Sequence, residues 1–348
     1  MSCRRKNLFA KICVSILLAL LAFNGNAFAG ADKAAIKSLY ERAKAEGKVV
    51  IWGPQKRTLA WMEKPFETEF PGVDLVWAAS LRSTPKIITE AKAGKHNLDV
   101  FHFSLTAGMI PLNKRGLLVK APFSIFGTQK NNIWLDGKMG LTHNYAYALV
   151  YAEGKVDPKE LPDTWKGFLD PKWKNKLVAS SFLLPFASAY LAMAWGENEA
   201  ADYLRALLNK QNILLTRQPR ESILKSGERV VSLADLPSLR TRYIENGVPS
   251  GYKLLDVVPL IQFGVGVVKD APHPNAGKLL ASWMASEKAK KIREEKTTVA
   301  DLMKGSTSPL AKEIYSSGAT VITDTVERAP TRGKFTKAMK KIVTGRTK

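Results

Sequence analysis

Residues 161–181 have the sequence LPDTWKGFLDPKWKNKLVASS, and this stretch decides the fold prediction. Pro162 and Pro171 each restrict the preceding residue to extended geometry, which predicts a turn before and after the residues between them. Between these turns, apolar residues recur at helical spacing and predict a short amphipathic helix whose buried face is Trp165, Phe168 and Leu169. A strand is expected to follow at residues 176–179.

Upstream of this stretch, helix and strand signals alternate along the chain. Strands are expected at 49–52, 73–79 and 98–103, with helices before, between and after them, the last helix running to Gly116. Strands that recur every ~25 residues with intervening helices are typical of a parallel sheet in an α/β protein. In such sheets ligands bind at the carboxyl ends of the strands.

The segment at 161–181 resembles the "LP-x-[ST]-W-x-D-L-x-D-P-K-W-K-G-K-I" segment of periplasmic solute-binding proteins that serve ABC importers. The similarity is greatest to the branch that includes ferric-ion, thiamine and other small-solute binders. GKVVIW, FETEFPGVDLVW and LDVFHFS are similar to other marks of that family, and KDAPHPNAGKLLASWMASEKAKK closely resembles its "K-x-A-P-H-P-x-A-A-K-L-F" segment. Together the matches span residues 49–290, most of the chain.

This resemblance implies an α/β, two-lobed periplasmic-binding-protein fold of type II. Each lobe would be a mixed sheet flanked by helices, and strands that cross between the lobes would form the hinge. The division expected on this basis is a first lobe at 30–143 with a return at 261–300, a second lobe at 144–260, and a C-terminal helical segment at 301–348 that packs on the second lobe.

Residues 1–29 have the three zones of a secretory signal peptide. A basic region is followed by the uncharged run ICVSILLALLAF, which is shorter than the ~20 residues that span a bilayer, and then by small residues at Ala27 and Ala29. Cleavage near Ala29 and a periplasmic location are therefore expected. Both cysteines, Cys3 and Cys13, fall inside this peptide, which excludes disulfides and cysteine metal sites from the mature chain.

The chain is strongly basic. It carries 53 Lys and Arg against 31 Asp and Glu, and removal of the four basic residues in the signal peptide leaves 49 against 31. Such a balance is found in proteins that bind polyanions or membrane surfaces. The lysines here are scattered, however, and only residues 334–348 are concentrated, so a solvated basic surface is the simpler interpretation. An organic anion as ligand would also fit this charge.

The expected strand ends supply the candidate site residues of the first lobe. Trp52 ends one strand, Ser80 and Arg82 follow the next, and Ser104 follows the third. The hydroxyls can donate hydrogen bonds, the helix N-termini beyond them offer free amides, and Arg82 can help to hold an anion. Taken singly, each could also be an ordinary helix cap.

The candidates in the rest of the chain complete the expected pocket. By the family resemblance, residues 139–152 form the hinge-crossing strand that precedes LPDTW, which puts Asn144 and Tyr145 near the cleft. Hydroxyls are expected in the turn that opens the next helix, arginines around Pro219 can grip an anion as forks, and an acid ends a strand at 230–234. These residues are Ser180, Ser181, Ser188, Arg217, Arg220 and Asp235.

Three other function classes remain open. Ferric binders of this family hold the metal with adjacent tyrosines near 230–243, where this chain has Tyr243 alone, and Ser104 stands where those proteins tend to carry an acid. An enzyme is disfavoured because the four histidines show no metal-ligand spacing and no P-loop, GxGxxG or GxSxG motif is present. The third class is an exported basic module that binds polyanions or membrane surfaces.

The sequence therefore predicts the periplasmic solute-binding component of an ABC importer. The expected ligand is a small-molecule solute, an organic or other small anion, held without a cofactor and without a metal. Closure of the two lobes over this solute would produce the form that the inner-membrane ABC permease recognises. A monomer that binds no nucleic acid is expected.

Overall fold

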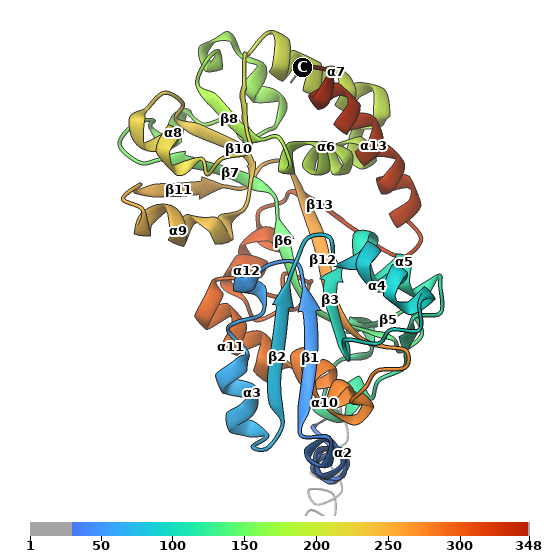
Figure 1. Cartoon of the computed structure of the whole chain (residues 1–348). Helices are drawn as coiled ribbons and strands as arrows, with labels where there is room; N and C mark the ends of the chain where they lie inside the picture. Colours follow the sequence, from blue (N-terminus) through green and yellow to red (C-terminus); the bar gives the residue numbers. More distant parts are fainter. Residues whose placement is uncertain (1–29, 347–348) are drawn as a thin grey trace, which may run out of the picture.

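The computed structural model describes residues 30–346, so the expected signal peptide at 1–29 lies outside the described residues. The described chain forms two α/β bodies joined by crossing strands, one above the other in Figure 1. This arrangement confirms the predicted fold class. No helix within the described residues has both the length and the apolar character needed to cross a membrane.

The lower body in Figure 1 is built on an eight-stranded sheet, here called sheet A. Its order is β2-β1-β3-β12-β6-β5, and β4 and β13 also pair with β12. The first three strands are parallel, whereas β12 runs antiparallel to β3 and β6. Its strands are β1 (Lys48–Gly53), β2 (Asp74–Ala79), β3 (Val100–Ser104), β4 (Leu118–Val119), β5 (Ile133–Trp134), β6 (Met139–Ala146), β12 (Val257–Val268) and β13 (Thr320–Thr323).

The upper body contains a five-stranded sheet, sheet B, in the order β11-β7-β10-β8-β9. β8, β9 and β10 are parallel, and β7 runs antiparallel to β10 and β11. Its strands are β7 (Ala148–Ala152), β8 (Leu177–Ser180), β9 (Leu214–Thr216), β10 (Val231–Asp235) and β11 (Ser250–Lys253). The expected crossing strand at 139–152 is thus two strands, β6 in sheet A and β7 in sheet B, with Tyr147 between them.

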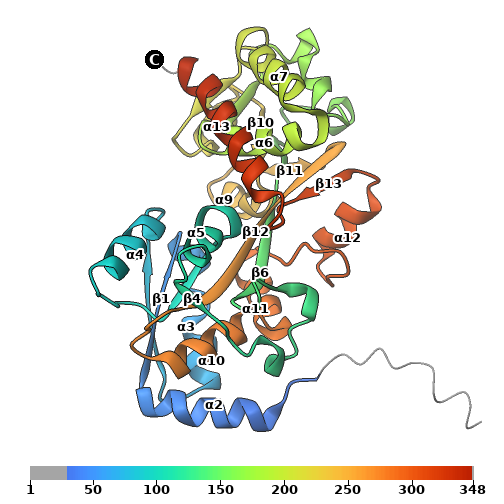
Figure 2. The ribbon, with the colours of Figure 1, turned by 90° about the vertical axis from the view of Figure 1, so that its right-hand side faces the viewer.

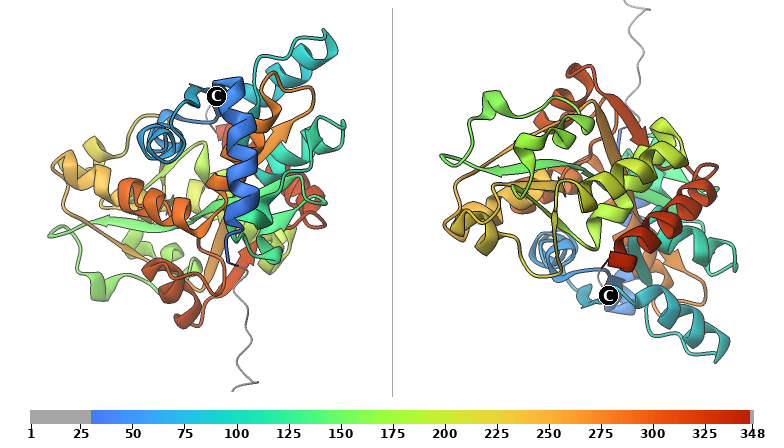
Figure 3. Two further views of the ribbon diagram at one scale, coloured as in Figure 1. Left: turned by 90° about the horizontal axis from the view of Figure 1, so that it is seen from below. Right: turned by 90° about the horizontal axis from the view of Figure 1, so that it is seen from above.

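Helices cover both sheets. Around sheet A, α2 packs on α10, and seen from below in Figure 3 the blue α2 lies closest to the viewer. Against sheet B, α6 packs on α7, and the C-terminal α13 packs on both, as Figure 2 shows, whereas β13 from the same C-terminal segment joins sheet A. The helices are α2 (Lys33–Glu46), α3 (Glu63–Glu69), α4 (Ser83–Lys92), α5 (Ile110–Asn113), α6 (Leu183–Trp195), α7 (Glu197–Asn209), α8 (Glu221–Ser226), α9 (Arg240–Glu245), α10 (Pro274–Met284), α11 (Glu287–Thr297), α12 (Pro309–Ser316) and α13 (Ala329–Arg346).

The LPDTW segment is anchored as predicted, but its helix is not an α-helix. Trp165 and Phe168 are fully buried, and the Trp165 indole Nε1 donates to the carbonyl of Val257 at 2.8 Å, at the start of β12. Two short 3₁₀ turns, Lys166–Leu169 and Pro171–Trp173, take the place of the expected helix. Pro171 leaves room for only one turn, because it lacks the amide hydrogen that would continue a helix.

Two other helix predictions are also corrected. α6 begins at Leu183, so Ser188 lies inside this helix and not in the turn that opens it. After β3 the chain forms a π-helical turn, Leu105–Met109, and the short α5, where one longer helix had been expected. The π-helical turn brings Gly108 so close to Phe103 that a Cβ would lie 2.4 Å from the Phe103 Cβ. Glycine is required there by this close approach.

Candidate functional site

A cavity of about 710 Å³ is lined by residues from both sheets. The carboxyl ends of parallel strands meet at it: Ser104 ends β3, Ser180 ends β8, and Arg217 follows β9. Tyr145 on β6 and Phe263 on β12 line it from the strands that cross between the bodies. These are positions at which ligands bind in α/β sheets, so the cavity lies where the sequence predicted the site.

The lining is mostly apolar, with hydroxyls, amides and arginines among the aromatic rings. The lining residues are Pro54, Gln55, Thr58, Leu81, Phe103, Ser104, Ala107, Tyr145, Tyr147, Ser180, Phe182, Leu183, Phe186, Arg217, Gln218, Pro219, Arg220, Leu236, Leu239, Arg242, Ile261, Phe263 and Arg332. A few convergent polar groups in an apolar cavity of this size are typical of a site for a small organic molecule.

Three of the nine predicted site residues line this cavity, namely Ser104, Tyr145 and Arg217. The other candidates at the strand ends of sheet A do not. Trp52 is almost fully buried, and the Lys86 ammonium lies 4.1 Å from the centre of its ring. Ser80 and Arg82 are exposed, and the Ser80 hydroxyl accepts from the Arg82 amide at 3.1 Å. These two residues shape the turn that leads into α4.

The remaining candidates support the cavity from behind or lie apart from it. The Ser181 hydroxyl donates to the carbonyl of Thr216 at 3.3 Å, which joins the ends of β8 and β9. Ser188 is fully buried inside α6, where its hydroxyl has no hydrogen-bond partner among the described residues. Asn144, which the family resemblance put near the cleft, is buried and accepts from the amide of Leu302 at 2.8 Å.

Asp235 does not line the cavity, but it binds Arg220, which does. It is fully buried and holds the Arg220 guanidinium by two bonds, of 2.8 Å from Nε and 2.7 Å from Nη2. Ser232 and Tyr243 donate their hydroxyls to the same carboxylate, at 2.5 and 2.6 Å. Burial opposes ionisation of this acid, but the Arg220 charge and these hydrogen bonds outweigh it and lower the pKa of Asp235. Asp235 therefore holds the positively charged guanidinium of Arg220 in the cavity wall.

A second buried carboxylate, Asp324, holds Arg332 in the same manner. The Arg332 Nε donates to Asp324 Oδ1 at 3.1 Å. Oδ2 of this acid accepts from Tyr190 on α6 at 2.8 Å and from Thr106, in the π-helical turn after β3, at 2.9 Å. Asp324 follows β13, so this one carboxylate connects elements that pack against both sheets. The sequence-based prediction did not include Arg332, which lies in the C-terminal α13, outside the segments that carried the predicted site.

Tyr147 lies where β6 passes into β7, and it was missed by the sequence-based prediction. It is 1% exposed, and its hydroxyl has no hydrogen-bond partner among the described residues. Burial raises the pKa of the Tyr147 phenol, with opposite smaller effects from Arg332 and Asp324. The phenol is therefore neutral and can donate into the cavity that it lines. Its alternation with Tyr145 on the predicted crossing strand was the signal that could have identified it.

Two lining residues, Tyr145 and Phe263, belong to an aromatic cluster that extends into the fold. The Phe263 ring stacks on His143 at 4.7 Å and meets Tyr145 edge-on at 5.3 Å. His102 lies beside them, fully buried, and its Nε2 is 3.1 Å from the Thr142 hydroxyl. Burial, followed by the nearby Arg293 charge, lowers the pKa of His102 to about 3, so this imidazole is neutral at physiological pH. These histidines pack within the fold, in keeping with the structural role predicted for them.

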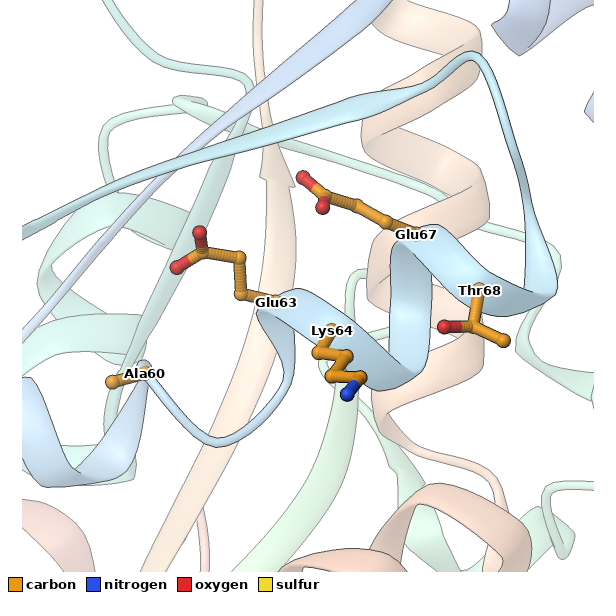
Figure 4. Close-up of a pocket in the computed structure, with 5 residues that line it drawn as sticks. All are labelled: Ala60, Glu63, Lys64, Glu67 and Thr68. Carbon is orange, nitrogen blue, oxygen red and sulfur yellow. The ribbon is translucent and has the colours of Figure 1, made fainter.

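A second hollow, of about 430 Å³, lies on α3 and is lined by Ala60, Glu63, Lys64, Glu67 and Thr68. Figure 4 shows that its side chains come from one helix and the turn before it. The two carboxylates already bind β2, since Glu63 accepts from the Trp77 indole at 2.8 Å and Glu67 from the amide of Leu75 at 2.9 Å. This one-sided hollow is therefore a weaker candidate than the cavity between the sheets.

The residues present favour no metal site. Among residues 30–346, no group of three or more His, Cys, Asp or Glu side chains is arranged to hold a metal ion. The cavity lining itself includes no carboxylate and no imidazole. Hard cations such as iron(III) prefer anionic oxygen donors.

Comparison with solved structures identifies the architecture. No family model and no curated protein matches the chain. Iron-bound HitA from Pseudomonas aeruginosa superposes with a TM-score of 0.68 at 19% identity, covering 85% of this chain and 99% of that one. The substrate-binding protein of an ABC transporter from Agrobacterium tumefaciens gives 0.67 at 14% identity, with 86% and 97% covered. The apo ferric ion-binding protein A of Pasteurella haemolytica gives 0.67 at 16% identity, with 86% and 97% covered. The chain therefore has the fold of the two-lobed periplasmic binding proteins.

Proposed function

We propose that this chain is the solute-binding component of an ABC importer and captures a small organic or other small anion between two lobes. The observation that carries the proposal is the cavity of about 710 Å³ where the strand ends of both sheets meet, with four arginines in its wall. Such a cavity has walls on two bodies connected by narrow crossing strands, which suits capture by hinged closure. The solute stabilises the closed form to the extent that it binds this form more tightly than the open form.

The proposed lobes follow the sequence-based division. The first comprises residues 30–143 with the return at 261–300, the second comprises 144–260, and the C-terminal segment at 301–348 packs on the second lobe through α13. Residues 1–29 serve as the export signal, so the mature chain acts in the periplasm as a monomer and delivers its solute to an inner-membrane permease. A carrier of this kind binds one equivalent of solute and releases it unchanged, which distinguishes it from an enzyme on the same fold.

Thermal unfolding of the purified protein against a solute panel tests this proposal. The panel holds carboxylates, phosphate and phosphonates, thiamine, polyamines, sugars and a ferric complex. A solute present at 100 times its dissociation constant adds ~2.7 kcal/mol to the stability of the form that binds it. One strong class with one-to-one stoichiometry is the expected result. Stabilisation by heparin or anionic vesicles alone, lost steeply as salt rises, would instead indicate a polyanion-binding module.

Ferric-iron transport is the second candidate, because two of the neighbours named above are iron-bound or ferric ion-binding proteins. Tyr145 and Tyr147 are the two tyrosines in the cavity lining. A protein of this kind would be coloured by charge transfer from tyrosinate to iron. The raised pKa of Tyr147 disfavours the phenolate that this requires.

A further inference from the structure

We propose that the solute is a small organic monoanion with a flat apolar body, whose anionic group binds Arg217. This inference rests on the proposed function and narrows its ligand class. It follows from the balance of charge around the cavity and from the distribution of apolar and donor groups on its walls.

Three of the four arginines in the cavity wall are already matched by carboxylates outside it. Arg220 pairs with Asp235 at 2.7 Å, and Arg332 pairs with Asp324 at 3.1 Å. The Arg242 Nε lies 2.5 Å from Glu221 Oε1. No carboxylate among residues 30–346 forms an ion pair with Arg217, and its side chain is exposed. One positive charge in the wall therefore lacks a partner.

Closure over a solute would move Arg217 out of water. An unmatched buried charge is strongly unfavourable, so the solute must supply a negative charge at this position. A guanidinium also binds a carboxylate through two parallel hydrogen bonds, which gives orientation as well as affinity. A dianion would leave one buried negative charge in excess, and a neutral solute would leave the guanidinium unmatched. A single negative charge satisfies the cavity.

The apolar part of the wall indicates the body of the solute. Phe182 is 53% exposed and Leu81 is 57% exposed, and both line the cavity, one from the side of sheet B and the other from the side of sheet A. The Phe182 ring packs on Phe186 at 5.1 Å. Large exposed apolar side chains that line a cavity gain free energy when an apolar body covers them. Aromatic rings also favour flat partners.

Three hydroxyls can orient the anionic group or a polar substituent of the solute. The Tyr147 hydroxyl is buried and without a partner among the described residues, and a donor in this state is satisfied when a ligand oxygen accepts from it. The Ser180 hydroxyl oxygen accepts from the amides of Phe182 and Leu183 at 3.2 Å, which leaves its hydrogen to donate. Ser104 faces the same cavity from the end of β3. All three lie at strand ends or at the crossing.

The experiment compares matched probes by titration calorimetry and thermal unfolding. Benzoate and 4-hydroxybenzoate each carry one negative charge on a flat apolar body. The controls are benzamide, a neutral analogue, isophthalate, a dianion, and acetate, a monoanion without the flat apolar body. Ferric citrate and inorganic phosphate complete the set. We expect the aromatic monoanions to bind at least about tenfold more tightly than every other probe, since a hydrogen-bonded ion pair contributes about that much or more.

Two variants locate the recognition elements. Arg217→Gln is expected to weaken binding of the aromatic monoanions about tenfold to a hundredfold, and not to weaken binding of benzamide, which leaves the wild-type guanidinium unmatched. Arg217→Lys should restore part of the loss. Arg205→Gln, in an exposed ion pair on α7, is the matched control and should change nothing. Phe182→Ser should weaken benzoate and benzamide alike, whereas Val76→Ser, an exposed apolar residue on β2, should affect neither.

The outcomes separate this inference from the proposed function. The inference would be overturned if benzamide, isophthalate, phosphate or ferric citrate bound more tightly than the aromatic monoanions. It would also be overturned if Arg217→Gln left the affinity for the aromatic monoanions unchanged. In both cases the chain would still be a solute-binding protein. The absence of any bound probe, including the wider panel above, would overturn both. Because Arg217 and Phe182 are both exposed, the variants are expected to fold, and their unfolding without solute verifies this.

Discussion

Asp235 holds the Arg220 guanidinium in a two-pronged ion pair, with Nε to Oδ2 at 2.8 Å and Nη2 to Oδ1 at 2.7 Å. Both side chains are buried, and the arginine lines the cavity. The pair is thus both a structural element of the sheet B body and the reason why Arg220 presents no unmatched charge to a solute.

Replacement of Asp235 by Asn should destabilise the protein, because it leaves the Arg220 charge buried and unpaired. Loss of one partner of such a pair lowers the free energy of unfolding by about 3 kcal/mol or more. Urea unfolding measures this loss. The double variant Arg220→Met with Asp235→Leu removes both charges and should be more stable than Asp235→Asn alone. Asp202→Asn, in an exposed ion pair, should change stability by less than ~1 kcal/mol. Equal losses in all three would contradict this account.

Thr106→Val tests the connection made by Asp324. The substitution removes one hydrogen bond of 2.9 Å to a buried carboxylate and keeps the shape of the side chain. We expect a loss of about 1.5–3 kcal/mol, the range for a hydrogen bond to a charged group, measured by urea unfolding. Thr89→Val, on the exposed surface of α4, serves as the control and should lose only a few tenths. A loss at Thr106 no larger than that at Thr89 would count against the connection.

His102 predicts a loss of stability in mild acid. Its pKa is lowered to about 3 in the folded protein from 6.5. Between these two pKa values, His102 is protonated in the unfolded chain and neutral in the folded chain. The free energy of unfolding therefore falls as pH decreases through this window. The slope is at most roughly 1.4 kcal/mol per pH unit. His102→Gln removes this contribution, so its free energy of unfolding should depend less on pH between 4 and 6. Parallel pH profiles for the two proteins would refute the prediction.

Gly264→Ala tests how tightly the crossing strands pack. A Cβ at this position of β12 would lie 2.1 Å from Met139 Cε and 2.9 Å from the carbonyl oxygen of Gly140. Because the second of these atoms belongs to the backbone, we expect a loss of about 1–3 kcal/mol in thermal or urea unfolding. Gly333→Ala is the opposite control, since a Cβ there meets no atom within 4 Å and the residue lies within α13. It should stabilise by up to about 1 kcal/mol, and a loss at Gly333 would show that this contrast fails.

The sequence alone determined the alternation of helices and strands and the anchoring of the LPDTW segment. Trp165 and Phe168 are buried as their spacing predicted, because local periodicity reports which face of a segment meets the core. It also predicted that a ligand would bind at the strand ends, and the cavity includes Ser104 and Arg217 at such ends. The type of helical turn after Pro162 could not be predicted from the sequence, since a few residues between prolines can form either an α-turn or a 3₁₀ turn.

Only the tertiary structure decided which strand ends share one cavity. Ser80 and Ser104 both lie at carboxyl ends of strands in sheet A, yet only Ser104 lines the cavity, because its strand β3 pairs with the crossing strand β12. The matching of buried polar groups was equally hidden: Asp324 accepts hydrogen bonds from Thr106, 218 positions away, and from Tyr190, 134 positions away. Periodicity along the chain encodes burial, whereas the pairing of polar groups that are distant in the sequence depends on the path of the folded backbone.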